Sequence, residues 1–574
     1  MITTFSYTVS KPTASKISHR AVVAALLLLL SSIPVFSQGE SGNSSVDSSR
    51  AKSDPLDGTV QVRSGRVQTN TSFEVAPPAP PSLKTMGGSG LGGGMAPGFA
   101  SPLTMTRVLG ATIGGAKDIG YARRLIEQGH VPNFIDFSPE GLYSEHDIPT
   151  PSGECNAKLC LSLGYGFAPA ADDRTNALFL QLGMNSNIKA DEFRRQNLQL
   201  AVVIDRSGSM EGESMEATKK ALHKLVENLN ANDELTIIQF DDKAQVILPA
   251  TRVSDKTAVN KLIDGITPDG GTDIELGLRL GFNQLANVPS REGASKRLFL
   301  FTDAMPNVGR TDSASFRTLT QKYADEGIGL TAFGVGVDFG HELVYHISQL
   351  RGGNFFYLET PEKVANVFDT EFDYLVTPLV YDLNVTIKTP PGLKLKAVYG
   401  LPTWKPGDRD AKLHVPTVFL SSNRGAIVLR YEREDNGTLG FSSGDLVASG
   451  TLGFTDVNGK EYKEQQEVHY NGQARLEPGA QYFTHDGIKL ATALTNIYFG
   501  LRDGCTLFAE GKREEAAEAV TRAKTLAALQ NAQLMDEGLT KEIKLLEKLA
   551  ENISKKGAEI HRNQSNEKQA PRSR

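Results

Sequence analysis

This sequence has few cysteines, a single tryptophan and no excess of positive charge, and each of these features argues against a class of protein. Three cysteines among 574 residues are too few for a scaffold built on many disulfides. A single tryptophan argues against the aromatic platforms that bind sugars. Acidic residues outnumber basic ones by 67 to 61. The net charge of −6 therefore argues against a general nucleic-acid binder, because phosphate binding needs a basic surface.

The remaining composition is that of a globular chain with several domains. Hydrophobic residues make up 39% of the chain and charged residues 22%, while glycine and proline, at 55 and 27 residues, are near average usage. At ~150 residues per domain, the length predicts about four domains. One hydrophobic core is not expected to serve a chain of this size.

An apolar run at residues 21–36 is shorter than the ~20 residues that a membrane-spanning helix needs. It follows two lysines and an arginine, and two serines and Pro34 interrupt it. This pattern predicts a secretory signal peptide over residues 1–37, with an uncleaved N-terminal anchor as the alternative. In both cases we expect the rest of the chain to be secreted, periplasmic or on the cell surface, with no transmembrane span in the mature chain.

Composition and hydrophobic periodicity divide the chain into segments of different character. They are a signal peptide (1–37), a disordered tether rich in Gly, Ser and Pro (38–105), an N-terminal segment (106–150), a β-sandwich (151–198 together with 374–475), an α/β domain (199–373), a helical region (476–556) and a polar basic tail (557–574). Two strand-like runs, at 161–167 and 176–184, precede the α/β domain. Two strands are marginal alone in water, so we expect them to join the later strands and make the α/β domain an insertion in the sandwich.

Within residues 199–373, apolar runs alternate with amphipathic patterns. The strands are expected at residues 198–204, 234–240, 297–302 and 329–335, and the helices at 215–229, 274–285 and 313–326. The runs are continuous rather than alternating, which is typical of strands buried on both faces. Strands that alternate with helices predict a doubly wound parallel sheet.

Three segments bring oxygen-bearing side chains to the carboxyl edge of this predicted sheet, where open parallel sheets bind their ligands. DRSGS follows the first strand and contains Asp205, Ser207 and Ser209; GGTD, before a helix, contains Thr272; TDA, at the end of the 297–302 strand, contains Asp303. Oxygen-only ligands select hard cations such as Mg²⁺, Mn²⁺ or Ca²⁺. Such a metal keeps water at one position, and an acidic group from a partner can displace it.

The sequences DRSGSM, GGTD and TDA, in this order, resemble the metal-ion-dependent adhesion site of von Willebrand factor type A (vWA) domains. All five residues match the site, residue by residue. In the family the serines and the threonine contact the metal directly or through water, and the carboxylates act mostly through water. FRRQNLQLAVVIDRSGSM and GGAKDIGYARRLIEQG are similar to segments of bacterial secreted proteins with this domain. The resemblance implies a Rossmann-like vWA domain and a metal site, and it leaves the partner open.

The resemblance leaves two functions open. The first is a binding module that engages a protein ligand with an exposed Asp or Glu through the cation. The second is a structural or regulatory subunit of an envelope assembly, in which the metal stabilises the fold or an interface. We expect no enzyme: His341 and His346 in HELVYH are five residues apart, about 140° around a helix, and cannot both face one zinc. The ligand and the oligomeric state are not predicted.

Three cysteines, one arginine and one substitution carry further expectations. In an oxidising compartment, Cys155 and Cys160 in ECNAKLC favour a local disulfide over free thiols, which leaves Cys505 buried in a helix. Arg206, inside the metal loop, could steer an acidic ligand or be only solvated. We expect Asp205→Ala to abolish metal binding with little loss of fold, on the view that the loop without metal is solvated.

Overall fold

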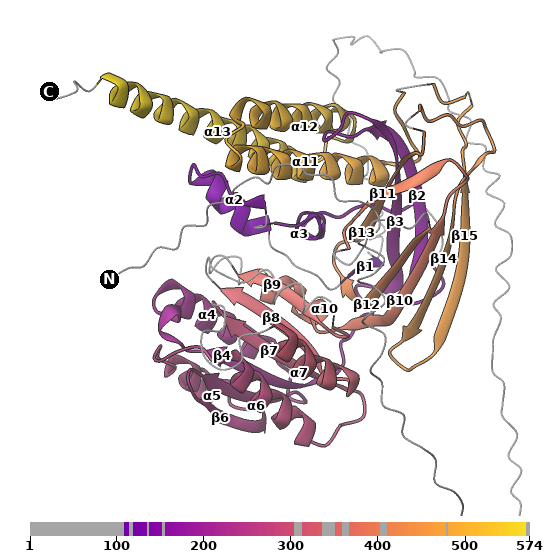
Figure 1. Cartoon of the computed structure of the whole chain (residues 1–574). Coiled ribbons are helices and arrows are strands. Elements are labelled where there is room, and N and C mark those ends of the chain that lie inside the picture. Colours follow the sequence, from indigo (N-terminus) through magenta and orange to yellow (C-terminus); the bar gives the residue numbers. More distant parts are fainter. Residues whose placement is uncertain are drawn as a thin grey trace, which may run out of the picture. The chain divides into compact units, whose positions relative to one another are not determined.

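The computed structural model of the protein describes residues 108–113, 119–134, 137–151, 155–303, 313–335, 350–358, 367–401, 410–435, 437–473, 475–477 and 480–569 (Figure 1). The predicted signal peptide and tether, and the HELVYH segment, lie outside the described residues.

A six-stranded sheet forms the centre of the α/β domain, with the strand order β6-β5-β4-β7-β8-β9. Its strands are β4 (Asn197–Asp205), β5 (Glu234–Phe240), β6 (Ala244–Arg252), β7 (Ala294–Thr302), β8 (Gly329–Val335) and β9 (Asn354–Leu358). Strand β6 runs antiparallel to β5, and the other pairs are parallel. The sheet is therefore mixed at one edge, where the half-exposed β6 carries Pro249, a residue that edge strands tolerate.

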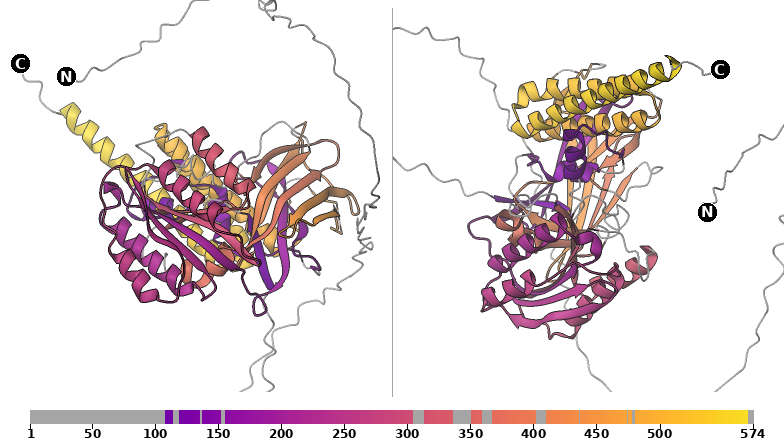
Figure 2. Two further views of the ribbon diagram at one scale, coloured as in Figure 1. Left: turned by 90° about the horizontal axis from the view of Figure 1, so that it is seen from below. Right: turned by 90° about the vertical axis from the view of Figure 1, so that its left-hand side faces the viewer.

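Helices cover both faces of this sheet (Figures 1 and 2). Helices α4 (Glu213–Asn228) and α5 (Lys256–Asp264) share one apolar core with the turn η3 (Val367–Glu371) and α10 (Phe372–Leu375). Helices α6 (Ile274–Asn287) and α7 (Ser313–Asp325) share the core on the other face. After α10 the chain enters β10 at Pro378, so the end of the domain leads directly into the second β-rich stretch.

Helix α6 lies unusually close to the sheet because two of its residues are glycines. A Cβ atom at Gly277 would lie 2.6 Å from the Phe240 ring, and one at Gly281 would lie 2.6 Å from the Val203 side chain. The helix backbone thus packs directly on β4, which leads to the first predicted metal loop, and on β5 beside it. This close packing fixes where α6 begins.

The second sheet has ten strands and is continuous. They are β1 (Val108–Ile113), β2 (Cys160–Pro169), β3 (Asn176–Lys189), β10 (Pro378–Lys388), β11 (Leu393–Tyr399), β12 (Ala411–Ser421), β13 (Ala426–Arg433), β14 (Leu446–Asp456), β15 (Glu461–His469) and β16 (Tyr482–Phe483). Strand β3 pairs with β13, with Leu178 opposite Tyr431, so strands from before and after the α/β domain share one sheet. Strand β1, inside the predicted N-terminal segment, joins β3 to β12.

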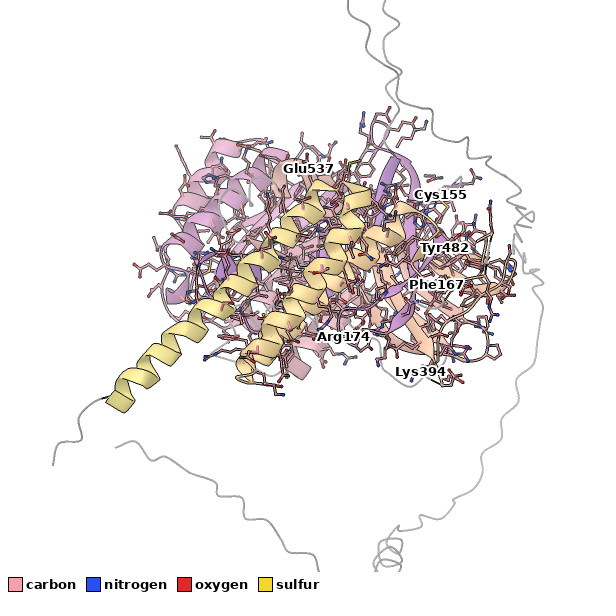
Figure 3. All side chains as sticks on the ribbon, turned by 90° about the horizontal axis from the view of Figure 1, so that it is seen from above. Cys155, Phe167, Arg174, Lys394, Tyr482 and Glu537 are labelled. Atoms are coloured by element: carbon pink, nitrogen blue, oxygen red, sulfur yellow. A yellow bond between two sulfur atoms is a disulfide. The ribbon has the colours of Figure 1, made fainter. Side chains whose placement is uncertain are left out.

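The strands predicted to form a β-sandwich lie in one sheet that curls over a common core, not in two separate sheets. Apolar side chains from β2 and β3 pack in one cluster with those from β10, β12 and β14. Where β2 approaches β15, a side chain of β15 accepts a hydrogen bond from the backbone of β2: Leu163 N donates to Gln466 Oε1 at 2.9 Å. Phe167 of β2 lies near Tyr482 of β16, with ring centroids 6.5 Å apart (Figure 3). The edge of β2 is therefore closed by side chains and the short β16.

Three antiparallel helices follow the sheet, side by side in Figures 1 and 2: α11 (Asp486–Ala509), α12 (Arg513–Leu534) and α13 (Glu537–Gln569). They share a core with α2 (Ile119–Glu127) and α3 (Pro139–Ser144). Leu539, Leu546 and Ile553 are buried on one face of α13. The helix continues to Gln569, beyond the predicted boundary at residue 556 and into the segment predicted as a tail.

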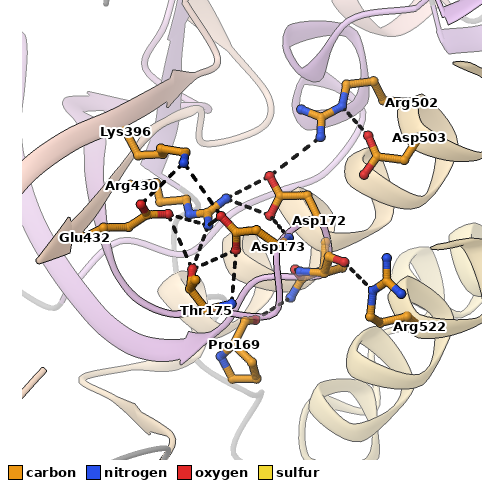
Figure 4. A network of polar contacts seen from close by, with 12 residues as sticks. Pro169, Asp172, Asp173, Thr175, Lys396, Arg430, Glu432, Arg502, Asp503 and Arg522 are labelled. Atoms are coloured by element: carbon orange, nitrogen blue, oxygen red, sulfur yellow. Dashed lines mark hydrogen bonds and ion pairs between the residues drawn. The ribbon is translucent and has the colours of Figure 1, made fainter. Parts of the chain in front are cut away.

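A buried ionic network ties β13 to the turn between β2 and β3 and to α11 (Figure 4). The Arg430 side chain is fully buried and donates to Asp172 at 2.7 Å, Asp173 at 2.6 Å and Glu432 at 2.7 Å. Arg502 of α11 also contacts Asp172, with an N–O distance of 3.6 Å. The Asp172 and Asp173 carboxylates of this turn are thus both paired with the Arg430 guanidinium.

The predicted fold class is confirmed: a Rossmann-like α/β domain is combined with an antiparallel β-rich sheet and C-terminal helices. No helix within the described ranges is long and apolar enough to cross a membrane.

Candidate metal centre

Asp205 is the last residue of β4, and its carboxylate is held in place from two sides. Oδ1 accepts a hydrogen bond from Ser207 N at 2.8 Å, and Oδ2 accepts one from Thr302 Oγ1 at 2.6 Å. Thr302 ends β7, the neighbouring strand, so adjacent strand ends meet here. Burial raises the pKa of the Asp205 carboxyl, although the hydrogen bonds from Thr302 and Ser207 oppose the shift. A nearby cation would favour the ionised form.

The expectation that the first loop is solvated is wrong at Asp205. The residue is fully buried and makes both of the hydrogen bonds described above. Asp205→Ala would remove an acceptor from two buried donors, so it would cost folding free energy as well as metal binding. It is therefore a poor test of the metal site alone.

Two hydroxyls and a second carboxylate lie beside Asp205. Ser207 Oγ and Ser209 Oγ are 3.1 Å apart, and Ser209 Oγ donates to Asp303 Oδ1 at 3.0 Å. Ser207 and Asp303 are buried, whereas Ser209 is exposed. Oxygens from two separate loops thus converge, and the cluster is open to solvent at Ser209.

Thr272 is fully buried on the loop that precedes α6, and hydrogen bonds between backbones join this loop to the first. Gly208 N donates to Gly270 O at 3.1 Å, and Asp269 N donates to Arg206 O at 2.6 Å. Gly270 has a φ of +76°, a conformation that favours glycine. The structure thus places all five predicted residues on three adjoining loops at the carboxyl ends of β4 and β7.

Arg206 joins these loops, and the structure supports neither earlier interpretation of it. Its guanidinium forms an ion pair with Asp241 and donates to Thr267 O at 3.1 Å, and its backbone N donates to Phe240 O at 2.9 Å. Asp241 follows β5, is 7% exposed, and accepts a hydrogen bond from Asp273 N through its backbone oxygen at 3.0 Å. The pair holds together the loop after β4, the loop after β5 and the loop before α6. Asp241 was missed, although its place after a predicted strand was a usable signal.

The donor set fits a hard divalent cation. It offers two carboxylates and three hydroxyls, and hydroxyl and carboxylate oxygens suit Mg²⁺, Mn²⁺ and Ca²⁺. Among the described residues there is no group of three or more His, Cys, Asp or Glu side chains arranged to hold a metal. Any metal at this edge would therefore depend on the hydroxyls. The residues that would hold it are Asp205, Ser207, Ser209, Thr272 and Asp303.

Cys155 is joined by a disulfide to Cys160, the first residue of β2, with a Cα–Cα distance of 5.6 Å; Figure 3 labels Cys155. Cys505 is buried in α11, as expected.

Comparisons with known proteins agree with this architecture. Residues 199–370 match the sequence model of the von Willebrand factor type A domain. The uncharacterized protein YfbK of Escherichia coli strain K12 is 26% identical over 280 residues, which cover 47% of this chain and 48% of that protein. The uncharacterized protein sll0103 of Synechocystis is 28% identical over 219 residues, which cover 38% of this chain and 51% of that protein. The chain thus spans about half the length of these relatives.

Two solved structures align with parts of this chain at low sequence identity. A von Willebrand factor type A protein from Catenulispora acidiphila is 16% identical and covers 66% of this chain and 89% of its own, with a TM-score of 0.43. Proximal thread matrix protein 1 from the mussel byssus, described with a zinc-occupied MIDAS motif, is 22% identical and covers 31% of this chain and 46% of its own, with a TM-score of 0.27.

Proposed function

We propose, from the premise that residues 199–370 form a von Willebrand factor type A domain, that this chain binds a protein ligand through a divalent cation. The cation is Mg²⁺, with Mn²⁺ or Ca²⁺ as alternatives. The ligand supplies an exposed Asp or Glu, and no reaction is assigned to the chain.

The observation that carries this proposal is the convergence of oxygens from two loops. Ser207 Oγ, Ser209 Oγ and Asp303 Oδ1 form a continuous chain of hydrogen bonds, 3.1 and 3.0 Å long, beside the buried Asp205 carboxylate. When bound, the cation supplies a coordination position for a carboxylate. Asp205 and Asp303 balance its charge, and the exposed Ser209 marks where a ligand can approach.

An extracytoplasmic location belongs to the same proposal. The disulfide between Cys155 and Cys160 supports it, because disulfides persist in oxidising compartments and are rare in the cytosol. The basic start and short apolar run of residues 1–37 support it independently.

Ser209→Ala tests the site with little risk to the fold, because Ser209 is an exposed residue of the short 3-10 turn Gly208–Met210. Titration calorimetry of the mature protein with Mg²⁺ or Mn²⁺ should show one site per chain. The variant should lose affinity by at least about ten-fold, since even residues that only support metal ligands cost that much. Ser254→Ala, which removes an exposed serine before α5, is the matched control. Equal metal affinity in both variants would overturn the metal site.

Capture of proteins from an envelope or secreted extract should depend on both the metal and Ser209. We expect the parent protein and Ser254→Ala to retain a partner with Mg²⁺ and to release it with chelator. Ser209→Ala should retain less at the same metal concentration. Capture that is indifferent to chelator and to Ser209→Ala would refute a cation-dependent ligand site.

A structural role for the metal is the second candidate, and the burial of Asp205 favours it. A cation beside a buried carboxylate that joins β4 to β7 would stabilise the domain itself. In that case Mg²⁺ should raise the melting temperature, and partner capture should not change when the metal is removed.

A further inference from the structure

Four exposed carboxylates surround the predicted metal centre. We call Glu211, Glu213, Asp242 and Asp269 the acidic rim. None of the four forms an ion pair with another described residue, in contrast to Asp241, which pairs with Arg206. The rim charges are therefore available to a ligand that reaches the metal. The inference drawn from them rests on the proposed function.

Glu211 and Asp269 lie close to predicted metal ligands in the chain, whereas Asp242 lies on the neighbouring loop after β5. Asp269 N donates to Arg206 O at 2.6 Å, and Glu211 N donates to Gly208 O at 3.3 Å. Asp242 Oδ2 is 3.1 Å from the position that a Cβ atom at Gly270 would occupy. Glu213 begins α4, directly after the first loop. Each rim residue is thus fixed by the backbone that positions the serines and Thr272.

Basic residues do not balance this charge. Residues 205–213, 241–243 and 265–275 contain eight acidic and two basic residues, and one of the acidic residues, Glu275, pairs with Arg279 of α6. Arg206, one of the two basic residues, is occupied by Asp241, which leaves Lys243. Residues 304–312, which follow Asp303, add one arginine and one aspartate in sequence and leave the balance unchanged. A divalent cation would cancel two negative charges, so the surface around it would stay negative.

We propose that the ligand presents its metal-binding Asp or Glu within a basic surface, with Lys or Arg side chains that face the acidic rim. A single carboxylate satisfies the cation, whereas neighbouring carboxylates on the ligand would be repelled by Glu211, Glu213, Asp242 and Asp269. Each unit charge at ~10 Å in water changes affinity by about two-fold. Four rim charges acting together are enough to discriminate between ligand surfaces at low ionic strength.

Synthetic peptides of matched length can serve as probes with the full mature protein. Three peptides carry one Glu flanked by Arg, by Ser or by Asp, and each has a partner peptide with Gln in place of Glu. At saturating Mg²⁺ we expect the Arg-flanked peptide to bind tightest and the Asp-flanked peptide weakest. The preference should shrink as salt rises, because charges are screened over about 8 Å at physiological ionic strength.

A double variant of the rim tests where the preference comes from. Asp242→Asn with Asp269→Asn should reduce the advantage of the Arg-flanked peptide over the Ser-flanked peptide by about four-fold for each Arg near the rim, at low ionic strength. Glu292→Gln with Glu326→Gln is the matched control. It removes the same charge from exposed residues just before β7 and β8, at the opposite edge of the sheet. The control should keep the parental preference.

The outcomes separate this inference from the proposed function. If Gln peptides bind as well as Glu peptides, if chelator has no effect, or if no peptide binds up to millimolar concentration, the proposed function is refuted. If binding needs Glu and Mg²⁺ but shows no preference for Arg over Asp, the acidic rim does not select the ligand. A preference that survives the rim double variant unchanged also overturns the inference.

Discussion

Replacing Arg430 with methionine tests the buried ionic network of Figure 4. Methionine fills similar space, so the change removes the charge without a large cavity. It leaves three carboxylates, Asp172, Asp173 and Glu432, whose side chains are 16%, 31% and 10% exposed. Removing one partner of a buried ion pair costs about 3–5 kcal/mol. We expect the lower end, about 3 kcal/mol, because Lys396 and Arg502 also contact these carboxylates.

The loss should depend on pH in a defined direction. Burial raises the pKa of Asp173, but hydrogen bonds from Thr175 and the charge of Arg430 lower it to about 2. A lowered folded-state pKa gives stability that is present above the unfolded value, near 3.9, and is lost as pH falls toward 2. Without Arg430, repulsion between the clustered carboxylates should raise their pKa values. Protonation of these carboxylates at lower pH should therefore restore part of the variant's stability. The gap between the parent and Arg430→Met should therefore be largest at pH 7 and should narrow as the pH falls toward 4.

Hydrogen exchange of the β13 and α11 amides, corrected for intrinsic rates, measures the local stability around the network even in a chain of several domains. Arg433→Met is the matched control on the same strand, because Arg433 pairs with the exposed Asp435 and with no other acidic residue in the described part of the chain. It should exchange like the parent at both pH values. Our account of the network is wrong if the β13 amides exchange as slowly in Arg430→Met as in Arg433→Met at pH 7. It is also wrong if the difference in stability between the parent and Arg430→Met grows as the pH falls.

Two further predictions concern other parts of the chain. Mass mapping of secreted material without reductant should find Cys155 linked to Cys160, and two alkylated thiols there would contradict the disulfide. Gly277→Ala should destabilise the α/β domain, because an added Cβ would press on the Phe240 ring. Overpacking of this kind costs about 1–3 kcal/mol of folding free energy. The higher helix propensity of alanine offsets about 1 kcal/mol of that cost. Because α6 starts beside Thr272, Mg²⁺ affinity should fall as well, and an unchanged melting temperature together with unchanged affinity would refute the close-packing argument.

The elements that could be predicted from sequence are those with a strong local pattern. Strands β4, β5, β7 and β8 are continuous apolar runs, and each lies within a few residues of its expected position. Helix α7 was expected at 313–326 and spans Ser313–Asp325. The metal loops followed from one rule, that ligands gather at the carboxyl ends of parallel strands.

The elements that were missed depend on distant partners. Strand β1 has only six residues, and its partners in β3 and β12 lie far along the chain. Strand β6 is a half-exposed edge strand that contains Pro249, so it lacks the apolar run of its neighbours. Helix α13 continues to Gln569 without apolar periodicity, as a helix nucleated by its packed first half can.

The hydrogen bonds and ion pairs around the site could not be predicted from the sequence either. That Arg206 pairs with Asp241, and that Asp205 is buried between two donors, depends on how three loops meet. Sequence showed which oxygens share an edge of the sheet. It did not show which of them are exposed.

The pairing of β3 with β13 has a consequence for the order in which the chain folds during synthesis. Strand β3 ends at Lys189, and β13 is complete only at Arg433. At ~5–20 residues per second, the wait is roughly 12–50 seconds. During this time the inserted α/β domain can fold, because its strands are joined by short crossovers, while the β3 edge that pairs with β13 and the β2 edge that pairs with β16 stay open. An open strand edge recruits other chains. The early hairpin, rather than the domain with the metal loops, is where a slowly made or crowded nascent chain should aggregate.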